Sequence, residues 1–433
     1  MTEQRKETFG YAPAEYKKFR KYGWRMLILY SLFYCALYCT RLNLANAGPQ
    51  MMAELGIMAA DIGVLTATLF WAYAIGMLLG GRLSEMVGPS RFIMLSTVLT
   101  ILMNVLFGFT NSLPLMAVLW AINGFAQALN WPSGCEILAN WWPGKTRGFA
   151  VGFASAFAGF GQALATVAVA LSFLLFPAAG WRAAFWLPAV FPFAFLILYL
   201  LFTRSSPAKI GLREYKEEDP KIAADEAAMQ EIVEKNGKLF PYRFLLSNPM
   251  FVLVLIIHIF TGIARYGLLT WVPMYFIERF GVDVMEGLFA SLALPVGMGI
   301  GSLILPTITD HMKNRMVLVP WIAVLSAATV VGFLFLDPRT AGGLILIEIL
   351  LFLAGFFVYS IAAILNAITC DYGGRVFSGT ANGLLGFTGY LGAGIQSVIY
   401  GTIVEKTGWN MVFISIAVLC LLSAGLSMIK KKD

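Results

Sequence analysis

Two arginines lie deep inside apolar segments, at matching positions in the two halves of the chain. Arg41 follows Arg25 by 16 positions within WRMLILYSLFYCALYCTRLNLANA, and Arg265 follows Pro249 by 16 positions within PMFVLVLIIHIFTGIARYGLLTWVPMYF. A guanidinium at that depth costs about 2.5 kcal/mol or more, so it rarely persists there without a task. Guanidinium groups stay charged and present a planar fork of donors that suits phosphate oxygens. Two of them at symmetric positions predict one binding site for an anion.

The alternative is that each arginine is neutralised permanently by a carboxylate of the chain itself. Glu136, in NWPSGCEILANWW, and Glu348, in LILIEILLF, are the acidic residues available inside apolar segments. In that case the arginines would be structural, and no anion would be needed.

The elements that must position these arginines are membrane-spanning helices. The chain of 433 residues is 59% hydrophobic and only 13% charged, whereas soluble domains are about 25% charged. Hydropathy divides it into about twelve stretches of roughly 20 residues, each long enough to cross a bilayer as a helix. The expected spans are 25–47, 60–84, 92–110, 114–140, 148–176, 181–203, 250–278, 284–309, 316–336, 341–369, 378–404 and 409–429.

Lysine and arginine placement predicts the orientation of these spans. Positive charge gathers in the N-terminal arm, in the even-numbered connections and in the tail, which ends Lys430, Lys431 and Lys432. The alternate loops are poorer, and 48–59 has neither residue type. Since cytoplasmic loops collect positive charge, both termini are expected in the cytoplasm. Basic residues so spread between hydrophobic spans argue against a nucleic-acid partner, and the absence of an N-x-S/T sequon favours a bacterial inner membrane.

One break in hydropathy divides the chain into two halves. Segment 204–249 holds the charged stretch RSSPAKIGLREYKEEDPKIAADEAAMQEIVEKNGK, which cannot bury enough apolar surface to form a core. The expected organisation is a cytoplasmic arm (1–24), a six-helix half (25–203), a cytoplasmic linker (204–249), a second six-helix half (250–429) and a cytoplasmic tail (430–433). In transporters built this way, substrate sites lie between the halves near mid-membrane.

Nothing in the chain indicates an enzyme. No nucleophile–base pair, metal-ligand set or phosphate-binding loop is visible, and the five cysteines lack metal-like spacing. We therefore expect no catalytic residues, no metal and no cofactor.

The connection after the second span resembles that of the major facilitator superfamily. GGRLSEMVGPSR (80–91) is similar to a loop in which glycine, an acidic residue and basic residues form a cytoplasmic latch, and Glu85 takes the acidic place. The second-half counterpart, ITDHMKNR (308–315), keeps Asp310. The resemblance implies an all-α membrane protein of twelve helices in two six-helix halves, with Glu85 and Asp310 as candidates for gating.

A narrower resemblance, to the organophosphate:phosphate antiporters, covers residues 25 to 425. It is carried by YCALYCTRLNLANAGPQM (34–51), NGFAQALNWPSG (123–134), NWWPGKTRG (140–148), SSPAKIGL (205–212), IARYGLLTWVPMY (263–275) and TANGLLGFTGYLGAG (380–394). The family's two substrate arginines fall on Arg41 and Arg265. Tyr34 and Tyr38, on one helix face with Arg41, and Tyr390 match family tyrosines that face the central cavity. For each tyrosine, packing or interfacial anchoring is the alternative.

Three departures from the glycerol 3-phosphate transporter pattern concern the same pocket. Met77 stands where that pattern has lysine, Ala158 where it has histidine, and Gly262 where it has tyrosine. The pocket loses two polar or cationic partners and one hydroxyl. This argues against glycerol 3-phosphate itself and towards a bulkier or less densely charged organic anion.

The resulting expectation is a monomeric secondary active transporter that exchanges a phosphorylated metabolite for inorganic phosphate. The first alternative is a proton-coupled symporter of a carboxylate, sulfonate or phosphonate, in which Glu136 carries the proton, since a desolvated carboxyl holds its proton more tightly. Glu136 could instead form a gate salt bridge with Arg147 or Lys145. The second alternative, from another class, is a membrane sensor for a sugar phosphate.

Overall fold

A computed structural model provides the structure of the chain. It describes residues 8–216, 220, 224, 231, 235–237, 240–312, 314–337, 340, 342–373 and 378–429. Within these ranges, the side chains at 81–87, 144–145, 147–148, 310, 333, 370–371, 373 and 378–379 are not described.

The first half consists of helices that run back and forth along one axis. They are α1 (Pro13–Leu37), η1 (Tyr38–Thr40), α2 (Asn43–Leu55), α3 (Ala59–Val87), α4 (Pro89–Phe107), α5 (Leu113–Ala128), α6 (Asn130–Trp141), α7 (Gly144–Leu175), η2 (Pro177–Arg182), α8 (Ala183–Trp186) and α9 (Val190–Phe202). Short elements η3 (Pro207–Ile210) and α11 (Phe240–Leu246) follow in the connection.

The second half repeats this arrangement. Its helices are α12 (Pro249–Phe280), α13 (Val284–Ser291), α14 (Ala293–Asp310), η4 (Arg315–Leu318), α15 (Val319–Phe333), α16 (Gly343–Gly373), α17 (Ser378–Thr407) and α18 (Trp409–Ser427).

Eleven helical segments of the described chain are long and apolar enough to cross a membrane. The one expected span outside these eleven segments, 378–404, corresponds to α17, which is rich in glycine and packs against α3, α12 and α16. Because α17 is covered by other helices, it does not need an apolar surface towards lipid. The predicted fold class, an all-helical membrane protein of twelve spans, is confirmed.

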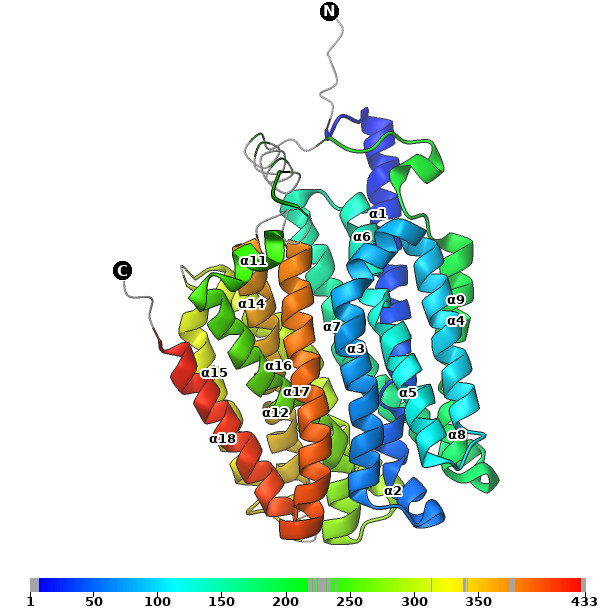
Figure 1. Ribbon diagram of the computed structural model, residues 1–433, viewed down its shortest axis with the longest axis vertical. Helices are drawn as coiled ribbons and strands as arrows, with labels where there is room; N and C mark the ends of the chain where they lie inside the picture. The colour runs from blue at the N-terminus through cyan, green and yellow to red at the C-terminus, as the bar shows by residue number, and fades with distance from the viewer. Residues whose placement is uncertain are drawn as a thin grey trace, which may run out of the picture.

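The two halves lie side by side, with α1 to α9 on one side of the bundle and α11 to α18 on the other (Figure 1). Helix α1 begins and α18 ends towards the same end of the bundle, which we call the termini end; α2 lies at the opposite, far end (Figure 1). Across the boundary, α3 packs against α17, α7 against α14, and α2 against α12 and α13. At the far end, the backbone N–H of Ala60 donates a hydrogen bond to Glu405 Oε1 at 2.8 Å.

Glycine allows the backbones of opposite halves to touch. A Cβ added at Gly63 of α3 would lie 2.1 Å from the carbonyl oxygen of Ser397 in α17. One at Gly159 of α7 would lie 2.4 Å from the Cα of Gly299 in α14. Helices in lipid associate through close packing, and here any side chain would force them apart.

The first span is not one continuous helix. Helix α1 ends at Leu37 and continues as a single 3₁₀ turn, and Arg41 and Leu42 separate that turn from α2. Arg41 itself has φ −115° and ψ −45°. The expected single span over 25–47 therefore misses a break, and Arg41 lies at it.

Candidate functional site

Each of the three guanidinium nitrogens of Arg41 donates a hydrogen bond. Nε donates to Oε1 of Gln127 at 2.8 Å, Nη1 to the hydroxyl of Tyr390 at 3.1 Å, and Nη2 to the hydroxyl of Tyr73 at 3.1 Å. The residue is 2% exposed. Tyr390 comes from the second half, so this guanidinium is held by both halves.

Aromatic rings enclose the same guanidinium. Its central carbon lies 4.3 Å from the ring centre of Tyr38, 4.5 Å from that of Tyr73 and 5.9 Å from that of Tyr34. A cation over a ring face is attracted by about 0.5–2 kcal/mol, more where water is excluded. The rings therefore offset part of the cost of burying the charge while leaving the charge in place.

Arg265 lies within the continuous helix α12 and is held differently. Its central carbon lies 4.6 Å from the ring centre of Tyr266 and 4.0 Å from that of Tyr359. Its Nε and Nη2 atoms are buried and have no hydrogen-bond partner. Buried charged donors without a partner are costly, so these two atoms are available to donate hydrogen bonds to an anion.

Among the described side chains, no carboxylate forms an ion pair with either arginine. The hydroxyl of Tyr390 accepts a hydrogen bond from Arg41 at 3.1 Å. The ring of Tyr390 also lies 5.5 Å from that of Tyr266, beside Arg265. The described structure therefore does not support permanent neutralisation by Glu136 or Glu348.

Buried amides surround the break next to Arg41. The carbonyl oxygen of Thr40 accepts hydrogen bonds from Asn104 Nδ2 at 3.2 Å, from Asn123 Nδ2 at 2.9 Å and from Gln127 Nε2 at 2.9 Å. All four residues are 0% exposed. Where a helix breaks inside a membrane, its freed carbonyls must find other donors; helices α4 and α5 supply them here.

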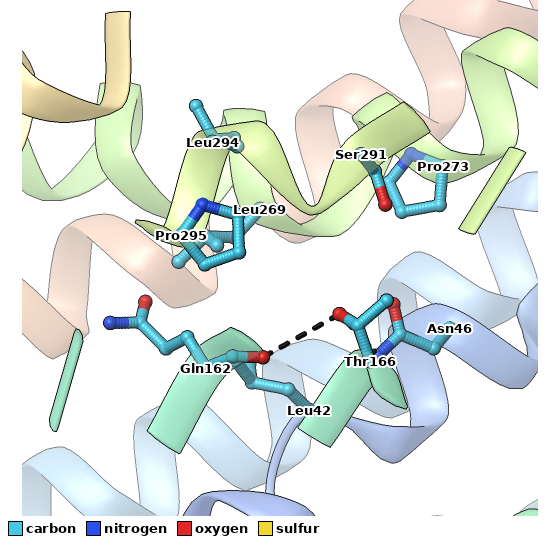
Figure 2. Close-up of a pocket in the computed structure, with 9 residues that line it drawn as sticks. All are labelled: Leu42, Asn46, Gln162, Thr166, Leu269, Pro273, Ser291, Leu294 and Pro295. Atoms are coloured by element: carbon cyan, nitrogen blue, oxygen red, sulfur yellow. Dashed lines mark hydrogen bonds between the residues drawn. The ribbon is translucent and has the colours of Figure 1, made fainter. Parts of the chain in front are cut away.

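A small cavity lies between the halves, and its lining includes Leu42 and Leu269, which follow Arg41 by one position and Arg265 by four (Figure 2). It offers about 10 Å³ to the centre of a water molecule, which is room for about one water. Its lining comes from both halves: Leu42, Asn46, Gln162, Thr166, Leu269, Pro273, Ser291, Leu294 and Pro295 (Figure 2). Asn46 Nδ2 donates to Thr166 Oγ1 at 3.3 Å. Around this cavity, α2 and α7 of the first half pack against α12, α13 and α14 of the second.

The structure brings together the five residues expected to bind substrate. Tyr34, Tyr38 and Tyr390 all contact Arg41, by ring or by hydroxyl, and Tyr390 links it to the surroundings of Arg265. Three other residues, Glu136, Glu85 and Asp310, are expected to couple or gate. Glu136 lies on α6 and is partly buried, and the side chains of Glu85 and Asp310 lie outside the described residues.

The three residues that depart from the glycerol 3-phosphate transporter pattern lie in well-defined surroundings. Met77 is 8% exposed and packs with Tyr73 and Tyr390. Ala158 is 3% exposed, and its carbonyl accepts from Gln162 Nε2 at 3.0 Å. A Cβ at Gly262 would lie 2.5 Å from the carbonyl oxygen of Gly389, so α17 occupies the space that a side chain would need.

Sequence reasoning missed several members of the cluster. Tyr73, Tyr266 and Tyr359 are single tyrosines in apolar spans, a pattern that packing explains equally well. Gln127 and Asn123 carried a clearer signal, because amide side chains four residues apart share one helix face within an apolar span.

Similarity to known proteins extends along most of the chain. Residues 26–397 match the Major Facilitator Superfamily. Two solved structures of a bacterial homologue of the human lysosomal transporter Spinster, inward-facing and either unoccupied or occupied, share the fold with TM-scores of 0.75 and 0.74. The first is 16% identical and covers 95% of this chain and 96% of its own.

The curated relatives include transport proteins and a membrane sensor protein, UhpC, of Escherichia coli, which is 25% identical over 93% of this chain and 91% of its own. A probable hexose phosphate transport protein of Chlamydia trachomatis is 26% identical over 95% of this chain and 91% of its own. The glycerol-3-phosphate transporter of Bacillus subtilis is 25% identical over 92% and 90%. A probable sulfoacetate transporter, SauU, of Cupriavidus necator is 28% identical over 87% and 86%. These relatives confirm the resemblance that the six motifs predicted, and their names are those of membrane transporters and a membrane sensor, not of enzymes.

Proposed function

The chain belongs to the Major Facilitator Superfamily, and we propose that it is a secondary active transporter that exchanges a small phosphorylated metabolite for inorganic phosphate. The observation that carries this proposal is the pair of arginines without carboxylate partners among the described side chains. Arg41 is buried, and Arg265, which is partly exposed, has two buried donor atoms with no acceptor. A tetrahedral oxyanion supplies several acceptors at once and balances two positive charges. The names of the hexose phosphate and glycerol-3-phosphate relatives support the same class of substrate.

Arg41 and Arg265 belong to opposite halves, so an anion bound between them joins the halves. Without an anion, the two positive charges repel each other inside the helical bundle, where Coulomb energies are larger than in solution. Either phosphate or an organic phosphate relieves this repulsion. The loaded protein therefore changes between its two orientations more readily than the empty one, and this difference produces obligatory exchange.

A ligand screen followed by counterflow tests the proposal. Purified protein is screened by thermal shift against phosphate, sugar phosphates, phosphonates and sulfonates, since a ligand that binds only the folded state raises the unfolding temperature. Proteoliposomes loaded with phosphate are then assayed for uptake of the stabilising anion. We expect stabilisation and exchange that both disappear in Arg41→Ala and Arg265→Ala. Uptake that proceeds equally well into phosphate-free vesicles would contradict exchange.

A second candidate is proton-coupled uptake of a sulfonate or carboxylate. Two observations favour it: Met77 and Ala158 leave the pocket without its extra cationic or polar partners, and the sulfoacetate relative is similar along most of the chain. The two candidates are separated by imposing a pH gradient on phosphate-free vesicles. Symport predicts uptake that follows the gradient and is lost in Glu136→Gln, whereas exchange predicts neither.

A further inference from the structure

The side chain of Gln127 links Arg41 to the break in the first span. Its Oε1 accepts from Arg41 Nε at 2.8 Å, and its Nε2 donates to the carbonyl of Thr40 at 2.9 Å and to Asn123 Oδ1 at 3.1 Å. A single amide therefore holds both the guanidinium and the backbone oxygen of the preceding residue.

The peptide group before Arg41 is fixed by several donors. The 3₁₀ turn ends at Thr40, whose carbonyl is met by side-chain amides of Asn104 in α4 and of Asn123 and Gln127 in α5. Donors arriving from two helices determine the direction of this carbonyl. Since the carbonyl belongs to the peptide bond that leads into Arg41, the backbone and the side chain of this arginine are held by the same set of amides.

The hydrogen-bond partners of Arg41 are all neutral. They are one amide oxygen and two phenol oxygens, from Gln127, Tyr390 and Tyr73. A carboxylate in the place of Gln127 would also accept from Nε, but it would cancel the positive charge. The amide orients the guanidinium and leaves the whole charge available to an anion.

Arg265 has no comparable frame. Helix α12 continues through it without a break, its neighbours are the rings of Tyr266 and Tyr359, and its Nε and Nη2 lack acceptors. The two arginines have symmetric positions in the sequence, but only Arg41 has a hydrogen-bond acceptor for each of its guanidinium nitrogens.

We propose that Gln127 is a positioning residue, which holds Arg41 in its ligand-binding orientation without reducing its charge. Arg41 is then the fixed donor of the site, and Arg265 is the donor whose hydrogen bonds are completed by the ligand. This inference rests on the proposed function, because it assumes that Arg41 binds an anion.

Two substitutions separate orientation from charge. Gln127→Leu removes the acceptor from Arg41 Nε and frees the guanidinium to turn; we expect inorganic phosphate to bind about 10- to 100-fold more weakly, as for the loss of one hydrogen bond to a charged group. Gln127→Glu keeps an acceptor for Arg41 Nε, but its carboxylate neutralises the positive charge of the guanidinium. We expect at least as large a loss of phosphate affinity. The unfolding temperature should fall in both variants, because neither replacement side chain can donate to the carbonyl of Thr40 or to Asn123 Oδ1.

Gln396→Leu is the matched control. Gln396 is also a 0% exposed glutamine, but its Oε1 accepts from the ring N–H of Trp271 at 2.9 Å. Its removal should lower the unfolding temperature about as much as Gln127→Leu does, and phosphate affinity should not change. Phosphate affinity is measured by titration calorimetry on purified full-length protein.

The outcomes distinguish the positioning role of Gln127 from the proposed exchange function. Weaker binding in both Gln127 variants, with normal binding in the control, supports the positioning role. If Gln127→Leu binds phosphate as tightly as the wild type does, this inference is overturned and the proposed function stays intact. A loss of affinity in Gln396→Leu equal to that in Gln127→Leu would also overturn it, because a general loss of packing would then explain both. No phosphate binding by the wild type would overturn the proposed exchange and this inference together.

Discussion

The hydroxyl of Tyr390 accepts a hydrogen bond from Arg41 Nη1 at 3.1 Å across the boundary between the two halves. Its ring lies 3.9 Å from that of Tyr73, which accepts from the other terminal nitrogen of the same guanidinium. A residue of the second half is therefore hydrogen-bonded directly to Arg41, the arginine of the first half that we propose to bind the anion.

Removing this hydroxyl should alter substrate affinity and the rate of reorientation together. Tyr390→Phe keeps the ring contacts and deletes one hydrogen bond to a charged group, worth about 1.5–3 kcal/mol. We expect apparent substrate affinity to fall by about tenfold or more, with a changed maximal exchange rate, measured by counterflow in proteoliposomes. Tyr400→Phe, on the same helix and outside the site, is the control and should behave as the wild type.

Lysine should not replace either arginine. Arg41→Lys and Arg265→Lys keep a positive charge, but an ammonium lacks the planar fork and the flat face that lies over tyrosine rings. We expect each variant to reach the membrane in normal amount and to lose exchange by about 100-fold or more, the effect of two lost charged hydrogen bonds. Near-normal phosphate exchange by either variant would show that no bidentate clamp exists.

Gly262 should be intolerant of any side chain. In Gly262→Ala, the added Cβ meets the carbonyl oxygen of Gly389 at 2.5 Å, and backbone atoms yield only by moving α12 from α17. We expect a loss of about 1–3 kcal/mol, read as a lower unfolding temperature of the purified protein. Gly425→Ala in α18 is the control, because its Cβ meets nothing within 4 Å. Equal unfolding temperatures for the two variants would contradict the close contact.

Met77→Lys tests how charge in the pocket selects the substrate. Met77 lies beside Tyr73 and Tyr390, so an ammonium there adds a positive charge next to the partners of Arg41. We expect the preference for methylphosphonate at alkaline pH over methanesulfonate to rise about tenfold, since a dianion gains more than a monoanion from a third cation. Met77→Leu should leave the preference unchanged. The measurement is competition of the two anions for counterflow, and an unchanged preference in Met77→Lys would mean that this position does not face the ligand.

The sequence predicted the helical architecture and the two arginines, because both depend on composition and on single costly residues. A guanidinium in an apolar span is conspicuous without knowledge of its neighbours. The break before Arg41 was not predictable in this way, because neither glycine nor proline marks the stretch Tyr38–Leu42. The break is stabilised by side-chain amides of α4 and α5, which are distant in sequence and donate hydrogen bonds to the carbonyl of Thr40.

The tyrosines show the same division between local and tertiary information. Tyr34 and Tyr38 could be assigned to the face of Arg41 from helical spacing alone. Tyr73 and Tyr359 reach the guanidinium groups from other helices, and only the packing of α3 and α16 places them there. The inequality between the two arginines is likewise invisible in their symmetric positions.

The broken first span also has a consequence for biogenesis. When this segment leaves the ribosome, the carbonyl of Thr40 has none of the partners that it has in the folded protein, because Asn104 and Asn123 are synthesised 64 and 83 residues later. An unsatisfied backbone group in lipid costs several kcal/mol. The first span is therefore expected to remain in the translocation machinery, or to insert as a regular helix and bend later, until the third and fourth spans arrive. Folding of the first half and completion of its arginine site are then a single event.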